Sequence, residues 1–186
     1  MPSKPRILIV GAGIGGLALA AGLDRRGITA TVVEIENASL SRGLALMLTS
    51  NAAVALRRAG LDQIVAERGV VVKEIVQTDA SGSVIDRHDL RPANERYGPN
   101  LGITREGLLS ALSGAARAQV RHSTSIGSVD WSTSTPEVVF TDGTRCQFDL
   151  IVGADGIRSA VRSLIHPQAR PAYRSFCAWR RPRPRR

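Results

Sequence analysis

The chain has 186 residues, of which 43% are hydrophobic and 22% are charged, and its formal net charge is +9. This length suits one domain with a real core, and the composition excludes a disordered chain and a membrane protein. Six arginines and no acid lie within residues 174–186, which leaves 19 basic and 16 acidic residues elsewhere. Because the charge is concentrated at one end, we expect neither a nucleic acid nor a membrane as partner.

Two cysteines are present, Cys146 and Cys177, without a CxxC spacing or a nearby pair of histidines. This pattern predicts neither a disulfide framework nor a zinc site, and we expect no metal. Two free thiols indicate a reducing, cytoplasmic environment.

Residues 7–23, ILIVGAGIGGLALAAGL, allow two interpretations. After Lys4 and Arg6 they could form the apolar part of a secretory signal, although 17 residues with five glycines are too short for a membrane span, which needs about 20 residues. The next residues are a polar helix end with a glycine and a β-branched run over 28–34 that ends on Glu34. Together these features favour a strand over 6–10, a helix over 14–26 and a second strand, which is a βαβ unit.

The glycines of the turn each have a physical reason in this βαβ interpretation. Gly11 allows the tight turn, Gly13 lets a pyrophosphate approach the backbone, and Gly16 lets the helix pack closely on the strand. Glu34 stands at the tip of the second strand, where a carboxylate accepts hydrogen bonds from an adenosine ribose and repels a 2′-phosphate. The sequence therefore predicts a dinucleotide site, with a glycine-rich structural turn as the alternative. The candidate turn residues are Gly11, Ala12, Gly13, Ile14, Gly15 and Gly16.

The middle of the chain is predicted from local patterns. Residues 35–50 form a long connection, and residues 50–61 read as a helix capped by Ser50 or Asn51 and stopped by Gly60. A β-hairpin is expected from 70–79 and 83–89, joined by a turn at Ser81 and Gly82.

The second half of the chain is predicted to be mostly strands. A helix is expected over 102–118, opened by Thr104, followed by strands near 124–130, 137–141 and 144–147 that suggest an antiparallel flap beside the parallel sheet. Residues 148–165 read as a strand, a glycine-rich turn and a helix, with Asp155 at the carboxyl end of the strand. This Asp155 turn fits a ligand site and an ordinary connection equally well.

The chain resembles the FAD-dependent aromatic-ring monooxygenases, such as p-hydroxybenzoate and salicylate hydroxylases, from residue 5 to about residue 180. The resemblance is carried by the glycine turn over 11–16, Glu34, Arg42, Arg105 and the GADGIRSAVR motif over 153–162, in this order. It implies an α/β fold with a Rossmann-like FAD-binding parallel sheet of the GR2 type, an inserted antiparallel β flap, and a substrate domain that is largely missing. The implied domain covers residues 1–175.

The resemblance assigns expected roles in holding the cofactor. The glycine turn and Glu34 hold the ADP half of FAD, Arg42 approaches the flavin side, and Arg105 reaches the pyrophosphate or the ribityl chain. The alternative for each arginine is a solvated surface residue.

Two further residues receive roles from the resemblance. Val129 lies near the adenine, although a core position is the alternative, and Asp155 helps to organise the pyrophosphate region and the encounter with NADH or NADPH. The three histidines, His88, His122 and His166, are interpreted as surface or loop residues, and no catalytic residue is expected.

The resemblance also implies an NAD(P)H-dependent monooxygenase with a small aromatic substrate. The chain departs from the family at Thr49 and Ser50, which stand where the family carries prolines, and the family's second flavin motif, GDAAH, does not occur. The Arg/Pro-rich tail over 176–186 cannot form a helix or a strand, and we interpret it as out-of-frame sequence. The alternatives are a truncated fragment that binds FAD or ADP without turnover, and a nucleic-acid binder that uses the arginine tail.

Overall fold

The computed structural model describes residues 4–37 and 44–172. The chain divides into two compact units: unit 1 contains residues 1–41 and 112–180, and unit 2 contains residues 42–111 and 181–186. Arg42 and the tail over 176–186 lie outside the described ranges 4–37 and 44–172.

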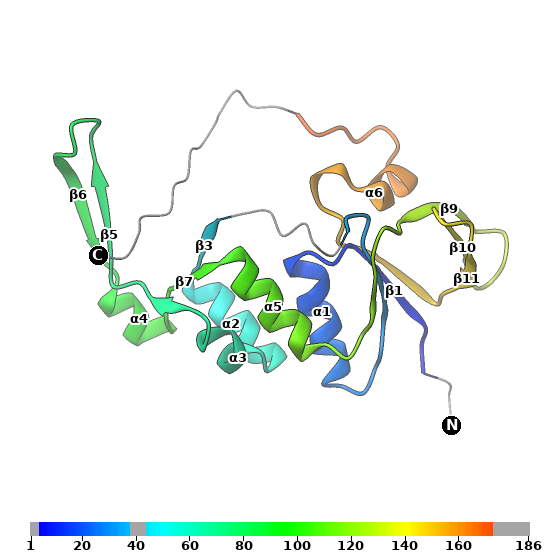
Figure 1. The fold of residues 1–186 in the computed structure, drawn as a ribbon, viewed down its shortest axis with the longest axis horizontal. Helices are drawn as coiled ribbons and strands as arrows, with labels where there is room; N and C mark the ends of the chain where they lie inside the picture. The colour runs from blue at the N-terminus through cyan, green and yellow to red at the C-terminus, as the bar shows by residue number, and fades with distance from the viewer. Residues whose placement is uncertain (1–3, 38–43, 173–186) are drawn as a thin grey trace. The chain divides into compact units, whose positions relative to one another are not determined.

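Unit 1 contains a parallel sheet, an antiparallel sheet and the helices that cover them (Figure 1). Its elements are β1 (Ile7–Val10), α1 (Ile14–Asp24), β2 (Thr31–Val33), β8 (Val120–Arg121), β9 (Ile126–Asp130), β10 (Glu137–Phe140), β11 (Arg145–Gln147), β12 (Leu150–Gly153), a 3-10 turn (Gly156–Arg158) and α6 (Ala160–Ile165). The parallel sheet has the order β12-β1-β2-β8, and β9, β10 and β11 form the antiparallel sheet. The predicted βαβ unit, the flap and the strand–turn–helix near the end are confirmed.

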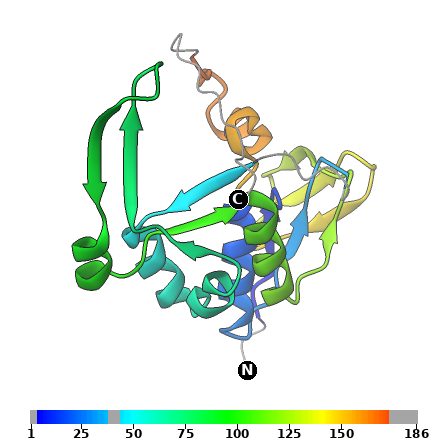
Figure 2. The same cartoon turned by 60° about the vertical axis from the view of Figure 1, so that its left-hand side comes forward.

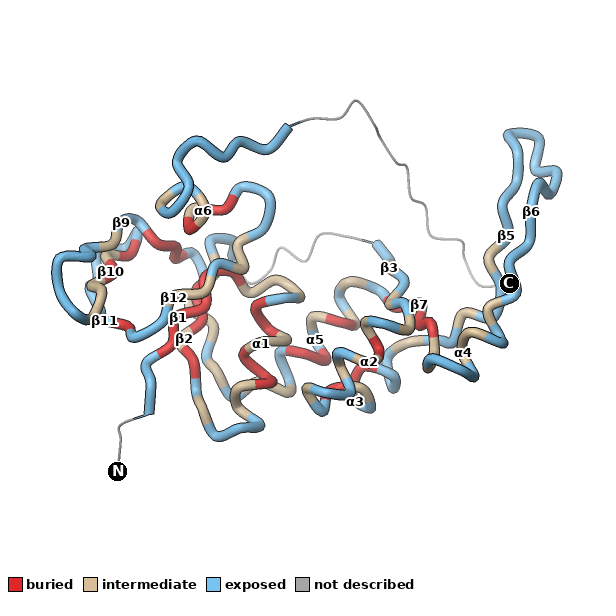
Figure 3. The backbone as a smooth tube through the Cα atoms, turned by 180° about the vertical axis from the view of Figure 1, so that it is seen from behind, coloured by how far each residue is buried: buried red, intermediate tan, exposed pale blue. Residues whose placement is uncertain are grey.

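The parallel sheet of unit 1 is covered on both faces, as the apolar sequence of β1 requires. Side chains alternate along a strand, so Ile7 and Ile9 pack in one cluster with Ala20 of α1. Leu8 and Val10 face the other way. Their cluster joins the flap to α6 and contains Leu8, Val10, Val33, Ile126, Val138, Phe140, Phe148 and Val161. Figure 3 shows this burial concentrated on β1 and β2. The flap is thus a layer on one face of the parallel sheet.

Unit 2 consists of a small antiparallel sheet, a hairpin and short helices. Its elements are β3 (Ala45–Leu48), α2 (Ser50–Ala59), α3 (Asp62–Ala66), β4 (Val70–Val71), β5 (Glu74–Thr78), β6 (Val84–Asp89), α4 (Arg91–Tyr97), β7 (Leu101–Thr104) and α5 (Arg105–Ala115), whose last turn belongs to unit 1. The sheet has the order β3-β7-β4, and β5 pairs with β6 in the predicted hairpin, drawn in green in Figure 2.

The connection expected over 35–50 contains β3, and residues 70–71 of the expected hairpin form β4 and pair with β7 instead. Two further local predictions in unit 2 are wrong at the start of a helix. The helix expected over 102–118 begins only at Arg105, because residues 101–104 form β7 and pair with β3 and β4. Thr104 nevertheless opens this helix as predicted, since its hydroxyl oxygen accepts a hydrogen bond from the Gly107 N–H at 3.0 Å. The N-cap position of the helix over 50–59 is occupied by Thr49, without a side-chain cap hydrogen bond, and not by Ser50 or Asn51. The Ser50 hydroxyl instead donates a hydrogen bond to the carbonyl oxygen of Gly98 at 2.8 Å. In both cases a partner distant in the sequence overrides the local pattern.

Candidate functional site

The turn between β1 and α1 depends on a glycine at residue 11. Gly11 has φ +106°, a region that residues with a side chain rarely adopt, and a Cβ there would lie 2.5 Å from the carbonyl oxygen of Ala154. The Gly11 N–H donates to the carbonyl oxygen of Val33, and the Ala154 N–H donates to that of Val10, both at 2.7 Å. The glycine turn is therefore packed directly against the turn that follows β12.

Gly13 and Gly16 have different surroundings from each other. A Cβ on Gly16 would collide with the carbonyl oxygen of Gly11 and would lie 3.3 Å from the Ile9 side chain, so Gly16 permits the close packing of α1. A Cβ on Gly13 would meet no atom of residues 4–37 and 44–172 within 4 Å. These residues thus give no packing reason for a glycine at residue 13, and they leave space beside it for a ligand.

The amino terminus of α1 provides a site for an anion. Gly13 is the N-cap, no side chain caps the helix, and the first turn contains no acid. The N–H groups of a first helical turn lack partners within the helix and carry the positive end of its dipole. A phosphate beside Gly13 would satisfy these donors.

Glu34 is brought to the same turn from the end of β2. One oxygen of its carboxylate, Oε2, accepts a hydrogen bond from the Ala12 N–H at 2.7 Å, and Oε1 accepts one from the Glu36 N–H at 3.0 Å. The side chain is half-buried. The carboxylate therefore has a fixed orientation beside the glycine turn, where it can accept hydrogen bonds from the hydroxyls of a ribose.

Asp155 follows β12, and its side chain accepts hydrogen bonds from the first turn of α6, whose N-cap is Ser159. The carboxylate accepts hydrogen bonds from the Ala160 N–H at 2.6 Å and the Val161 N–H at 3.2 Å through Oδ2, and from the Ser159 hydroxyl at 2.5 Å through Oδ1. Ser159 in turn accepts from the Arg162 N–H at 2.9 Å. Asp155 thus fixes α6 and the backbone of residues 154–155, against which Gly11 is packed.

The remaining predicted residues lie in different parts of the fold. Val129 lies within β9 and not after it, opposite Val138, and packs on the cluster that joins the flap to β1. Arg105 begins α5 in unit 2, where its N–H donates to the carbonyl oxygen of Leu44 at 3.0 Å. His88, His122 and His166 are exposed, as expected.

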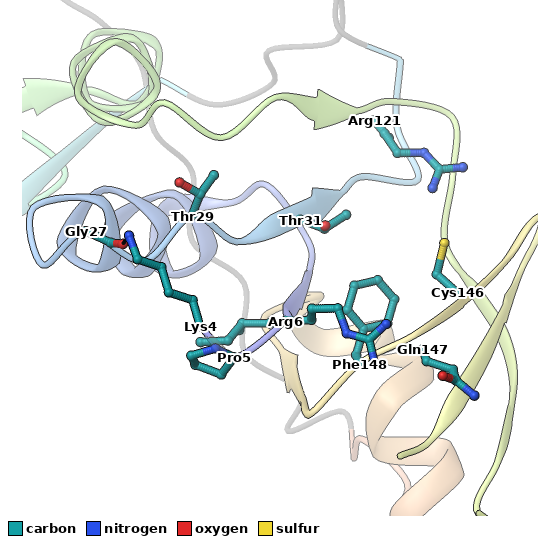
Figure 4. A pocket seen from close by; sticks show the side chains of 11 residues that line it. Lys4, Pro5, Arg6, Gly27, Thr29, Thr31, Arg121, Cys146, Gln147 and Phe148 are labelled. Carbon is teal, nitrogen blue, oxygen red and sulfur yellow. Dashed lines mark hydrogen bonds between the residues drawn. The ribbon is translucent and has the colours of Figure 1, made fainter. Parts of the chain in front are cut away.

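A hollow of about 660 Å³ in unit 1 lies at the opposite end of β1 from the glycine turn (Figure 4). Its walls are formed by Lys4, Pro5, Arg6, Ile7, Gly27, Thr29, Thr31, Arg121, Cys146, Gln147 and Phe148. Parallel α/β sheets bind ligands at the carboxyl ends of their strands, and this hollow lies at the amino-terminal end of β1. It is therefore separate from the site formed by the glycine turn and Glu34.

One part of the site has no signal in the sequence. Residues 121–124, which follow β8, form backbone hydrogen bonds with residues 34 and 36 and hold the segment that carries Glu34. A turn without glycine or proline is not recognisable as part of a ligand site from its residue types alone.

Comparisons with known proteins agree on one family. The sequence model of the family described as "FAD binding domain" matches residues 4–179. The chain is 33% identical over 181 residues to an aurachin C monooxygenase/isomerase from Stigmatella aurantiaca, which covers 94% of this chain and 46% of the relative. It is 35% identical over 165 residues to the 3-amino-4-hydroxybenzoate 2-monooxygenase PtmB3 from Streptomyces platensis, which covers 87% of this chain and 42% of the relative.

A solved structure supports the same assignment at the level of the fold. The crystal structure of Klebsiella pneumoniae HpxO complexed with FAD and uric acid matches with a TM-score of 0.72 and 28% identity, covering 85% of this chain and 41% of that one. The chain thus spans less than half the length of these relatives. In the part of the chain that the structure describes, no helix has both the length and the apolar character needed to cross a membrane.

Proposed function

This chain belongs to the FAD binding domain family, and we propose that its unit 1 holds the ADP half of FAD between the glycine turn and Glu34. The observation that carries the proposal is the position of the Glu34 carboxylate, 2.7 Å from the Ala12 N–H, beside the open space at Gly13. The uncapped first turn of α1 receives the pyrophosphate, and Glu34 accepts hydrogen bonds from the adenosine ribose.

Other residues take supporting roles in this proposal. Asp155 keeps the turn after β12 packed against Gly11 and in this way shapes the pyrophosphate region. Arg105 and Arg42 are proposed to contact the pyrophosphate or ribityl chain and the flavin side of FAD, and Val129 to contribute to the adenine surroundings.

The reaction that we propose is the hydroxylation of a small aromatic compound with NADH or NADPH as the electron donor. FAD supplies the redox chemistry when bound, because protein side chains do not carry out hydride uptake and activation of molecular oxygen. The relatives whose names describe monooxygenases of aromatic compounds support this substrate class. The residues of this chain bind and orient the cofactor, and we assign no catalytic side chain among them.

A second candidate function is a fragment that binds FAD or ADP without turnover. One observation in its favour is that this chain matches only 46% and 42% of the length of the two relatives. The other is the outer strand β12, where Leu150 is 52% exposed. A parallel sheet is ordinarily buried, so such an apolar outer strand is suited to contact further polypeptide.

A visible absorbance spectrum of the purified chain tests both candidates. The protein is mixed with excess FAD, desalted and scanned, and we expect a flavin band that is shifted from that of free FAD. Oxidation of NADH or NADPH is then measured with and without a panel of hydroxybenzoates. Donor oxidation that is stimulated by an aromatic compound supports the monooxygenase. A flavin band without oxidation supports the binding fragment, and a colourless protein contradicts the proposed FAD site.

A further inference from the structure

The turn formed by residues 121–124 holds the backbone of Glu34 at both of its polar groups. β8 is the parallel neighbour of β2, with Arg121 opposite Val33. The Glu34 N–H donates to the carbonyl oxygen of Arg121, and the Glu34 carbonyl oxygen accepts from the Thr124 N–H, both at 2.9 Å. Glu34 is therefore fixed at a position where β2 has already ended.

The same turn also holds the residue that orients the Glu34 carboxylate. The Ser123 N–H donates to the carbonyl oxygen of Glu36 at 3.4 Å, and Nδ1 of His122 lies 3.3 Å from that oxygen. Glu36 in turn donates its N–H to Oε1 of Glu34 at 3.0 Å. The turn, the loop after β2 and the glycine turn thus form one hydrogen-bonded chain that ends at the Ala12 N–H.

The conformation of Ser123 makes this arrangement possible. Its φ is +55°, and among residues 4–37 and 44–172 it is the one non-glycine residue with positive φ. The left-handed conformation lets the successive N–H groups of Ser123 and Thr124 reach the same short segment, 34–36. The turn is closed by the Thr124 hydroxyl, which donates to the His122 carbonyl oxygen at 3.1 Å and belongs to a buried residue.

We propose that Ser123 is a positioning residue for the recognition of the ribose. Its left-handed conformation directs the turn over 121–124 onto the segment 34–36, and this contact places the Glu34 carboxylate for the ribose hydroxyls of an ADP-containing ligand. Ser123 itself does not contact the ligand in this proposal. The inference rests on the proposed function, because it requires that Glu34 binds a ribose.

The test compares two ligands on the same protein. ADP and 2′,3′-dideoxy-ADP share the adenine and the pyrophosphate and differ in the ribose hydroxyls, so the ratio of their dissociation constants measures the contribution of Glu34. We expect the wild-type chain to prefer ADP by about 10-fold, the size of a hydrogen bond to a charged group. Glu34→Gln should reduce this preference to about 2-fold, because the neutral amide forms weaker hydrogen bonds.

Variants at residue 123 separate positioning from stability. Ser123→Val should lower the preference for ADP to that of Glu34→Gln and leave the affinity for dideoxy-ADP unchanged, because a β-branched residue strongly disfavours positive φ. Ser123→Gly is the matched control and should keep the wild-type preference, since glycine adopts this conformation without strain. Ser123→Thr provides a second perturbation in the same direction if the valine variant does not fold, because threonine is also β-branched but keeps the hydroxyl.

The outcomes distinguish the inference from the function on which it rests. A wild-type chain that binds both ligands equally contradicts the role of Glu34 and removes the basis of the inference. A wild-type preference for ADP that persists in folded Ser123→Val or Ser123→Thr overturns the inference and leaves the ribose site intact. A double variant of Ser123→Val with Glu34→Gln should show the same preference as Glu34→Gln alone, and a further loss would indicate a general structural effect.

Discussion

Replacement of Gly13 by alanine tests whether the open space beside this residue is reserved for a phosphate. A Cβ at Gly13 meets no atom within 4 Å in the part of the chain that the structure describes, and φ is −72°, which alanine adopts freely. The variant should therefore fold. Alanine restricts the unfolded chain more than glycine does, which stabilises the folded protein by about 0.4–1 kcal/mol. Alanine is also a poorer N-cap than glycine, which costs about 0.5–1 kcal/mol. Because these effects nearly cancel, the melting temperature should change by no more than about 4 °C.

The effect of Gly13→Ala on binding should be much larger than its effect on folding. The methyl group occupies the space where a pyrophosphate would approach the N–H groups of α1. The loss of one hydrogen bond to a charged group costs about 1.5–3 kcal/mol, which corresponds to about 10-fold to 150-fold weaker binding of FAD or ADP. Isothermal titration calorimetry with ADP and thermal unfolding of the same samples measure the two quantities.

The matched control for this variant is Gly114→Ala. Gly114 lies in α5, where an added Cβ also meets no atom within 4 Å, but it is not part of the proposed site. The control should bind ADP as the wild type does. If Gly13→Ala is folded and binds ADP with wild-type affinity, then Gly13 does not face the phosphates and the assignment of the site is wrong. A Gly13→Ala protein that fails to fold would contradict the open space.

Three further predictions concern stability. Gly11→Ala should lower the urea midpoint, with a cost of at least about 1–2 kcal/mol from the positive φ alone, and an unchanged midpoint would contradict the contact with Ala154. Asp155→Ala removes the carboxylate that accepts from the Ala160 and Val161 N–H groups at the start of α6 and should cost about 1–2 kcal/mol in thermal unfolding, whereas an unaltered melting temperature would show that these hydrogen bonds are unimportant. The Thr144 hydroxyl and N–H, together with Arg121, keep the pKa of Asp142 below its usual 3.8. A carboxyl with a lowered folded pKa contributes stability above its unfolded pKa and loses it as the pH falls, so the free energy of unfolding of Asp142→Asn should decline less steeply below about pH 4. The free energy of unfolding is measured by urea titration of both proteins at several pH values in that range. If it falls equally steeply with pH in both, the prediction is wrong.

Several parts of the site were predictable because they depend on neighbours in the sequence. An apolar β-branched run, a glycine turn and an apolar helical run define the βαβ unit locally, and Glu34 follows its second strand directly. The structure confirms this unit and places the Glu34 carboxylate on the Ala12 N–H. The reason given for Gly16 also holds, since its added Cβ would collide within the same turn.

Other features could not be predicted because their partners are distant in the sequence. Residues 101–104 become a strand because β3 and β4 offer them backbone hydrogen bonds, and this outweighs the local helical pattern. The tight turn predicts a glycine at residue 11, but its second reason, the contact with Ala154, arises only after the sheet has formed.

The sequence by itself determined the type of fold and the residues of the glycine turn, since strand, turn and helix propensities act over a few residues. The tertiary structure decided how Glu34 is held, because the 121–124 turn meets the segment 34–36 only through the pairing of β8 with β2. It also decided that the Asp155 carboxylate holds the start of α6, since one oxygen accepts from the Ser159 hydroxyl and the other from the Ala160 N–H. The propensity of a segment for helix, strand or turn depends on adjacent side chains, whereas the partner of a backbone N–H group depends on the fold that surrounds it.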